Sequence, residues 1–316
     1  MDTNPPTAPL PEIPAPGDAS AGPPSPALLI PPAPESRLRK IGRGFLFWLI
    51  YLAMGGVLVF VLGVVLHYAH PKSGGSVWWM MTSETGLMLA AILPGFVMAL
   101  IEGLPFGAFG LPRRHAFGRN FWAGTLWGIA SLSVLMMVLR ASGAFSFGSL
   151  ALHGLSLLKF ALFYGVFFLF TGFFEEFLLR GYSQWVLSKG MGFWPTAVLL
   201  SATFGAIHGA NSGETKVGLV AAGLIGFFFC LTLRRTGDLW WAVGFHMSWD
   251  WGESFLFSVP DSGGMMPGHL LNSSFHGPAW LTGGTVGPEG SYVVFGVIAA
   301  MWVVFDRMYP GVKYES

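Results

Sequence analysis

The chain has 316 residues, of which 53% are hydrophobic, 16% are aromatic and only 10% are charged. A soluble globular protein carries about 25% charged residues, so this chain has too few charges to cover a water-facing surface. Its formal net charge of +1 gives no basic field for nucleic acid, and its single cysteine, Cys230, excludes an intramolecular disulfide framework. The composition therefore predicts a helical protein that crosses a membrane several times.

Residues 1–36 differ in composition from the rest of the chain. They hold 12 of the 22 prolines and no aromatic residue, so they cannot bury a core. We expect residues 1–36 to form a disordered, proline-rich cytoplasmic tail and residues 37–316 to form a single membrane domain.

Mostly apolar runs, each bounded by charges, proline or glycine, follow this tail. They lie at about 44–66, 84–104, 120–140, 155–180, 194–210, 217–233, 238–258 and 290–306. A transmembrane helix needs about 20 predominantly apolar residues. The sequence therefore predicts an all-α, polytopic transmembrane bundle of about eight spans, with residues 259–289 as an outer loop.

The distribution of basic residues predicts the orientation. If the tail is cytoplasmic, 13 of the 17 Lys and Arg residues fall on the cytoplasmic side. We therefore expect a multi-pass integral membrane protein with both termini in the cytoplasm, in a plasma membrane of bacterial type. No internal repeat is visible, which disfavours a transporter built from inverted repeats.

Ionisable residues inside the predicted spans indicate a site, because each costs at least about 2.5–3.5 kcal/mol at the bilayer centre. Glu84 and Glu102 lie at the ends of the second run and are interpreted as interfacial. The others occupy three runs: Glu175, Glu176 and Arg180 in the fourth, His208 in the fifth, and His246, Asp250 and Glu253 in the seventh.

Helical spacing sorts the charges of the fourth run. Glu176 and Arg180 are four residues apart, so they share a face and can form an ion pair. Glu175 points about 100° away from Glu176 and cannot share that pair, which makes it a candidate general base or acid. His246 and Asp250 also share a face, and His208 supplies a second imidazole.

The depths of these groups in the membrane restrict where the fourth helix can end. A helix that ended at Arg180 would place Glu175 far below His208 and His246. We therefore predict that the fourth helix continues through Gln184 to about Lys189, which brings the three side chains to a similar depth around one cavity.

Three motifs occur in order on hydrophobic segments. They are Glu-Glu-x-x-x-Arg at 175–180, Phe-x-x-x-His at 204–208 and His-x-x-x-Asp at 246–250. They resemble the motifs of the CPBP family, which includes the type II CAAX prenyl endopeptidases and the ABI-like bacteriocin-processing proteins. The resemblance covers about residues 155–258, a third of the chain.

The resemblance implies an intramembrane endopeptidase with a membrane-embedded catalytic cavity. Its substrates would be membrane-associated peptides or proteins, including prenylated CAAX-type or bacteriocin-like ones, and membrane lipids would surround it. Carried over by motif, Glu175 activates water, His208 helps to hold it, and His246 with Asp250 stabilises the oxyanion. The supporting residues are Glu176, Arg180 and Phe204.

One motif position departs from the family. Many members carry Asn where this chain has Asp250. Asn donates a hydrogen bond to an oxyanion, whereas an ionised Asp repels one. Asp250 must therefore be protonated, orient His246 or bind a metal.

Other chemistries are left open by these residues. Glu175, His208, His246 and Asp250 could hold a catalytic zinc ion, but no His-Glu-x-x-His motif occurs. We favour glutamate-activated water with no obligatory cofactor. The alternatives from other classes are a proton-coupled membrane transporter, in which the same groups relay protons, and a non-catalytic immunity or scaffold protein.

Overall fold

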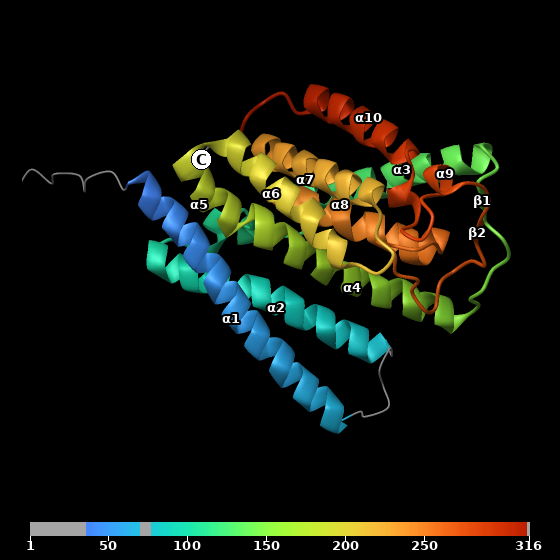
Figure 1. The fold of residues 1–316 in the computed structure, drawn as a ribbon, viewed down its shortest axis with the longest axis horizontal. Coiled ribbons are helices and arrows are strands. Elements are labelled where there is room, and N and C mark those ends of the chain that lie inside the picture. Colours follow the sequence, from blue (N-terminus) through green and yellow to red (C-terminus); the bar gives the residue numbers. More distant parts are fainter. Residues whose placement is uncertain (1–35, 70–76, 315–316) are drawn as a thin grey trace, which may run out of the picture. The chain divides into compact units, whose positions relative to one another are not determined.

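The computed structural model describes residues 36–69 and 77–314, so residues 1–35 of the expected tail lie outside the described residues. The described chain is mostly helical (Figure 1). Its elements are α1 (Arg37–Ala69), α2 (Val77–Glu102), η1 (Phe106–Phe109), η2 (Arg113–His115), α3 (Arg119–Ala141), β1 (Phe145–Ser146), α4 (Leu155–Arg180), α5 (Tyr182–Met191), α6 (Phe193–Ile207), η3 (His208–Ala210), α7 (Lys216–Thr236), α8 (Trp240–Trp251), η4 (Gly252–Phe257), β2 (Ser274–Phe275), α9 (Ala279–Thr282), η5 (Pro288–Gly290) and α10 (Val293–Met308).

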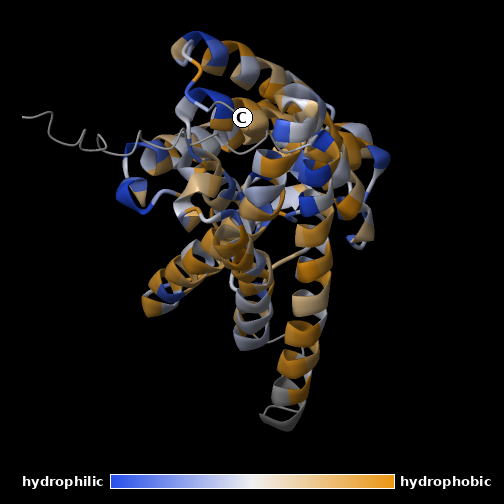
Figure 2. Cartoon of the chain, turned by 90° about the vertical axis from the view of Figure 1, so that its left-hand side faces the viewer, coloured by the Kyte–Doolittle hydropathy of each residue, from blue (hydrophilic) through white to orange (hydrophobic). Residues whose placement is uncertain are grey.

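The predicted helical membrane architecture is confirmed in its coarse form. Hydrophobic residues follow the long helices over most of their length (Figure 2). Among the described residues, five helical segments are long and apolar enough to cross a membrane: Arg37–Val64, Val77–Glu102, Arg119–Ala141, Leu155–Met191 and Lys216–Thr236. Three of the eight predicted spans correspond to the shorter helices α6, α8 and α10, of 15, 12 and 16 residues.

The prediction of one continuous fourth helix through Lys189 is wrong at Gly181. Helix α4 ends at Arg180, and α5 begins at Tyr182 after a single residue. Gly181 has φ −77° and ψ −117°, outside the helical region, and a Cβ there would lie 2.4 Å from the Phe177 carbonyl oxygen. The bend allows the Tyr182 hydroxyl to donate to Glu102 at 2.7 Å.

Helix α1 lies beside α2 at one side of the bundle and also packs against α5 (Figure 1). Much of its apolar surface is not covered by the described part of the chain: the exposed fractions of Leu52 and Phe60 are 63% and 71%. Exposed apolar side chains on a long apolar helix are typical of a surface in contact with lipid.

Helices α3 and α8 approach each other through glycines. A Cβ at Gly124 would lie 1.9 Å from the Trp241 carbonyl oxygen, and one at Gly244 would lie 2.1 Å from the Phe121 carbonyl oxygen. Small residues let two membrane helices bring their backbones into contact. Because α8 carries His246 and Asp250, this glycine contact helps to position the site.

We expect Gly124→Ala to destabilise the protein by about 1–3 kcal/mol, because overpacking forces the backbones of α3 and α8 apart. Chemical unfolding of the purified protein in detergent would measure the loss. Gly56→Ala is the matched control, since a Cβ at Gly56 meets nothing within 4 Å. Equal stability of the two variants would contradict the close contact.

The long segment after α8 folds back over one end of the bundle. Strand β2 pairs antiparallel with β1, with Phe275 opposite Phe145. The segment after η4 places Asp261, and η5 places Glu289, in the wall of the cavity described next.

Candidate active site

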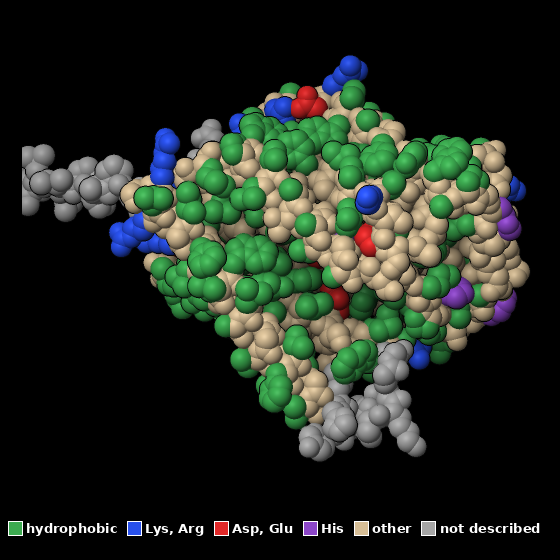
Figure 3. Space-filling model, in the orientation of Figure 1, with side chains coloured by type: hydrophobic (Ala, Val, Ile, Leu, Met, Phe, Trp, Pro, Cys, Tyr) green, Lys and Arg blue, Asp and Glu red, His purple; other side chains and the backbone are tan. Residues whose placement is uncertain are grey.

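A cavity of about 400 Å³ lies among the helices. It brings together the four residues that the sequence singled out, Glu175, His208, His246 and Asp250. Its wall comes from α2, α4, α6, α7, α8 and α10, from η3 and η5, and from the segments after η3 and η4. Figure 3 shows a hollow on one face of the molecule in which an acidic side chain is visible.

The His246 imidazole contacts three carboxylates. Its Nδ1 lies 3.0 Å from Glu176 Oε1, and its Nε2 lies 3.5 Å from both Glu175 Oε2 and Asp250 Oδ2. Glu175 lies outside the pair of Glu176 with Arg180 and faces the imidazole instead. Nδ1 is within hydrogen-bonding distance of Glu176 Oε1, whereas Nε2 approaches Glu175 and Asp250 at ion-pair distance without a hydrogen bond.

Glu176 and Arg180 form the ion pair that their spacing predicted. Arg180 Nη1 lies 3.3 Å from Glu176 Oε1, and both side chains are fully buried. The guanidinium lies over the Phe204 ring, 4.4 Å from its centroid. Gly226 makes room for it, since a Cβ there would lie 2.3 Å from Arg180 Nη2. Glu176 thus joins Arg180 to His246.

His208 begins η3, at the end of α6. Its Nδ1 lies 2.8 Å from the Phe204 carbonyl oxygen. A carbonyl only accepts hydrogen bonds, so Nδ1 carries the proton and Nε2 of the neutral ring is an acceptor. Among the described residues, no hydrogen bond or ion pair joins His208 to Glu175 or His246, although all three line the cavity.

The interpretation of Glu84 as an interfacial residue is wrong. Helix α2 begins at Val77, seven residues earlier in the chain, so Glu84 lies two turns inside it. Only 8% of Glu84 is exposed, and it lines the cavity. Glu102 does lie at the end of α2, where it pairs with Arg43 at 2.6 Å.

Three further acidic residues line the cavity outside the predicted motifs: Glu214 after η3, Asp261 after η4 and Glu289 in η5. Burial raises the pKa of the Glu214 carboxyl, and the nearby Glu289 adds to the effect. Burial also raises the pKa of Asp261 well above its usual range, again with a contribution from Glu289. No periodicity connects these loop residues with the motifs.

The cavity is acidic. Its described lining contains six carboxylates and two imidazoles, and neither Lys nor Arg. Opposite charges concentrate in a cleft lined by one sign of charge. A cation or a positively charged part of a ligand is therefore favoured there.

The geometry fits the zinc alternative poorly. Within the described ranges, one set of three potential ligand residues has donor atoms within 4.8 Å of one another, and it is Glu253, Asp261 and Glu289. The four candidates Glu175, His208, His246 and Asp250 supply no such set, so their side chains would have to move to coordinate one ion.

A comparison with known families agrees with the motifs. Residues 157–252 match the family model described as Type II CAAX prenyl endopeptidase Rce1-like. This match supports membership of the CPBP family for the segment. It contains Glu175, His208, His246 and Asp250, whereas Asp261 and Glu289 follow it. No curated protein and no solved structure matches the chain.

Proposed function

We propose that the protein is an intramembrane endopeptidase that hydrolyses peptide bonds of membrane-associated substrates with glutamate-activated water. The observation that carries the proposal is the arrangement around His246. Its imidazole contacts Glu175, Glu176 and Asp250 beside a cavity that His208 also lines, within the Rce1-like segment. A hydrolytic site needs a base and hydrogen-bonding groups around one water position.

In the proposed mechanism, Glu175 removes a proton from a water molecule that donates its other hydrogen bond to His208 Nε2. The water oxygen bonds to the peptide carbonyl carbon and forms a tetrahedral oxyanion. As the oxyanion collapses and the C–N bond breaks, Glu175 passes the proton to the leaving amine. His246 Nε2 faces the carbonyl oxygen as negative charge develops on it. Glu176 holds the imidazole through Nδ1, and the buried Arg180 holds Glu176.

Metal dependence is a separate part of this proposal. Glutamate-activated water requires no obligatory metal, so turnover should survive extensive treatment with a chelator. A zinc mechanism through Glu175, His208, His246 and Asp250 instead requires loss of activity with zinc and recovery when zinc returns.

The experiment that tests the function uses the purified protein in lipid vesicles. Peptides of CAAX type, with and without a prenyl group, and an unrelated hydrophobic peptide report hydrolysis and its preference. Cleavage supports the endopeptidase. A proton flux without cleavage supports the transporter, because the same ionisable groups could relay protons through the membrane. A protein with neither activity supports the scaffold or immunity function.

The proposal includes the topology. We propose eight spans, of which α6, α8 and α10 are the shorter ones. Both termini then lie in the cytoplasm, and the membrane is a plasma membrane of bacterial type. A reporter fused to the C-terminus that is active only in the cytoplasm tests this orientation. Activity of a reporter that requires export would reverse it.

We expect Asp250→Asn to retain or raise turnover. The substitution restores the residue common in the family and replaces a carboxylate that repels an oxyanion with an amide that donates a hydrogen bond. Peptide cleavage measures the effect. A loss of turnover together with bound metal would instead assign Asp250 as a metal ligand, because amide oxygen is a weaker ligand than carboxylate.

A further inference from the structure

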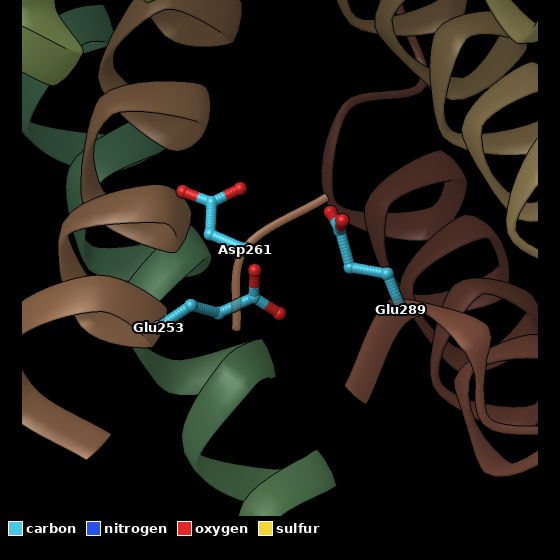
Figure 4. Close-up of side chains that lie close together, drawn as sticks. All are labelled: Glu253, Asp261 and Glu289. Atoms are coloured by element: carbon cyan, nitrogen blue, oxygen red, sulfur yellow. The ribbon is translucent and has the colours of Figure 1, made fainter. Parts of the chain in front are cut away.

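Three carboxylates from separate segments meet beside the cavity, and two of them, Asp261 and Glu289, line it. They belong to Glu253 in η4, Asp261 in the segment that follows it, and Glu289 in η5 (Figure 4). One oxygen of each lies within 4.8 Å of the others. None of the three lies in the motifs of the proposed active site.

The buried carboxylate of Glu253 is a second, independent indication of a ligand site. The residue is fully buried, and among the described residues neither carboxylate oxygen has a hydrogen-bond partner. The Trp249 side chain approaches the carboxylate, but without hydrogen-bonding geometry. A buried ionised carboxylate is strongly unfavourable unless it is paired or coordinates a metal.

The carboxylates of Asp261 and Glu289 are each fixed by hydrogen bonds at one oxygen. The second oxygen of each remains available to a ligand. The Ser254 hydroxyl donates to Asp261 Oδ2 at 3.1 Å. The backbone N–H and hydroxyl of Ser262 donate to Glu289 Oε2 at 3.2 and 2.9 Å. Within the described ranges, no hydrogen bond reaches Asp261 Oδ1 or Glu289 Oε1, and no Lys or Arg forms an ion pair with any of the three.

We propose that Glu253, Asp261 and Glu289 bind one calcium ion. The donor set consists only of oxygen, which hard divalent cations prefer over zinc or copper. Three carboxylates from separate segments favour calcium over magnesium, since calcium accepts irregular oxygen geometry, whereas magnesium demands stricter octahedral geometry and retains its water. The ion would tie the segment after α8 to η5 and the start of α10.

Calcium binding to the purified full-length protein in detergent tests the proposal. After removal of divalent ions with a chelator, calorimetric titration with calcium chloride should show one site per chain. Saturating calcium should also raise the thermal unfolding midpoint, because a ligand that binds the folded state stabilises it. Titrations with magnesium and zinc chloride measure selectivity.

Variants identify the ligands. Glu253→Gln and Glu289→Gln should each weaken calcium binding by about tenfold or more, because each loses a carboxylate ligand. Without calcium, Glu253→Gln should unfold at a temperature at least as high as the parent, since it removes an unpaired buried charge. If Glu253→Gln fails to fold, Glu289→Gln still tests the calcium site.

Controls separate this site from the rest of the acidic cavity. Glu214→Gln changes a carboxylate of the same cavity wall outside the trio, and it should bind calcium like the parent. The proposal is overturned by absence of calcium binding up to about 1 mM, the range of weak sites. Equal loss in Glu214→Gln, or unchanged binding in both trio variants, overturns it as well.

Discussion

Glu175→Gln is expected to fold and insert normally while losing peptide cleavage by roughly 10²–10⁴-fold, the usual contribution of a positioned general base. Glutamine keeps the shape of glutamate and can still contact His246 Nε2, which lies 3.5 Å from Glu175 Oε2. It cannot accept a proton from water. The loss should therefore appear in the turnover number, with little change in unfolding temperature or peptide affinity.

Two further variants test the same expectation. His208→Ala should also lose turnover, because its Nε2 would no longer hold the attacking water. Glu84→Gln changes another carboxylate of the same cavity wall that has no place in the mechanism, so it should retain far more activity than Glu175→Gln. Cleavage by Glu175→Gln at the parent rate would reject the glutamate mechanism and favour the transporter or the scaffold.

Arg180→Ala is expected to lower stability by about 3–5 kcal/mol, the usual cost of removing one partner of a buried ion pair. Both Arg180 and Glu176 are fully buried, and Glu176 would keep only its contact with His246. Activity should fall with yield and stability, because the orientation of His246 depends on Glu176. Chemical unfolding and quantitative expression measure the two effects.

The matched control is Arg140→Ala, which removes an exposed arginine at the end of α3 and should be near neutral. Combining Arg180→Ala with Glu176→Gln should recover part of the lost stability, since the stranded charge is gone. A stable but inactive Arg180→Ala protein would move Arg180 from a supporting role to the catalytic residues.

Contacts within one helix could be predicted from sequence because they depend on helical periodicity alone. The spacing of four residues predicted the pairs Glu176–Arg180 and His246–Asp250, which lie at 3.3 and 3.5 Å. The contact between Glu176 and His246 was not predicted, because it depends on how α4 and α8 are rotated about their axes. Hydropathy carries no information about that rotation.

Helix ends and loops account for the other differences between the predicted and the observed structure. The break at Gly181 was missed because the apolar pattern continues across it, although glycine has low helix propensity. The start of α2 was placed too late, which put Glu84 at the membrane surface. Asp261 and Glu289 reach the cavity through tertiary packing of a long connection, and no repeat or spacing connects them with the motifs.

The glycine contact between α3 and α8 also restricts how the sequence can vary during evolution. A side chain at position 124 or 244 would meet a backbone carbonyl, which cannot move away as a flexible side chain can. Relatives that keep this helix pair should therefore retain glycine there even where residue 250 changes between Asp and Asn. The restriction comes from the distance between two backbones, so it should persist in relatives that have lost the catalytic glutamate.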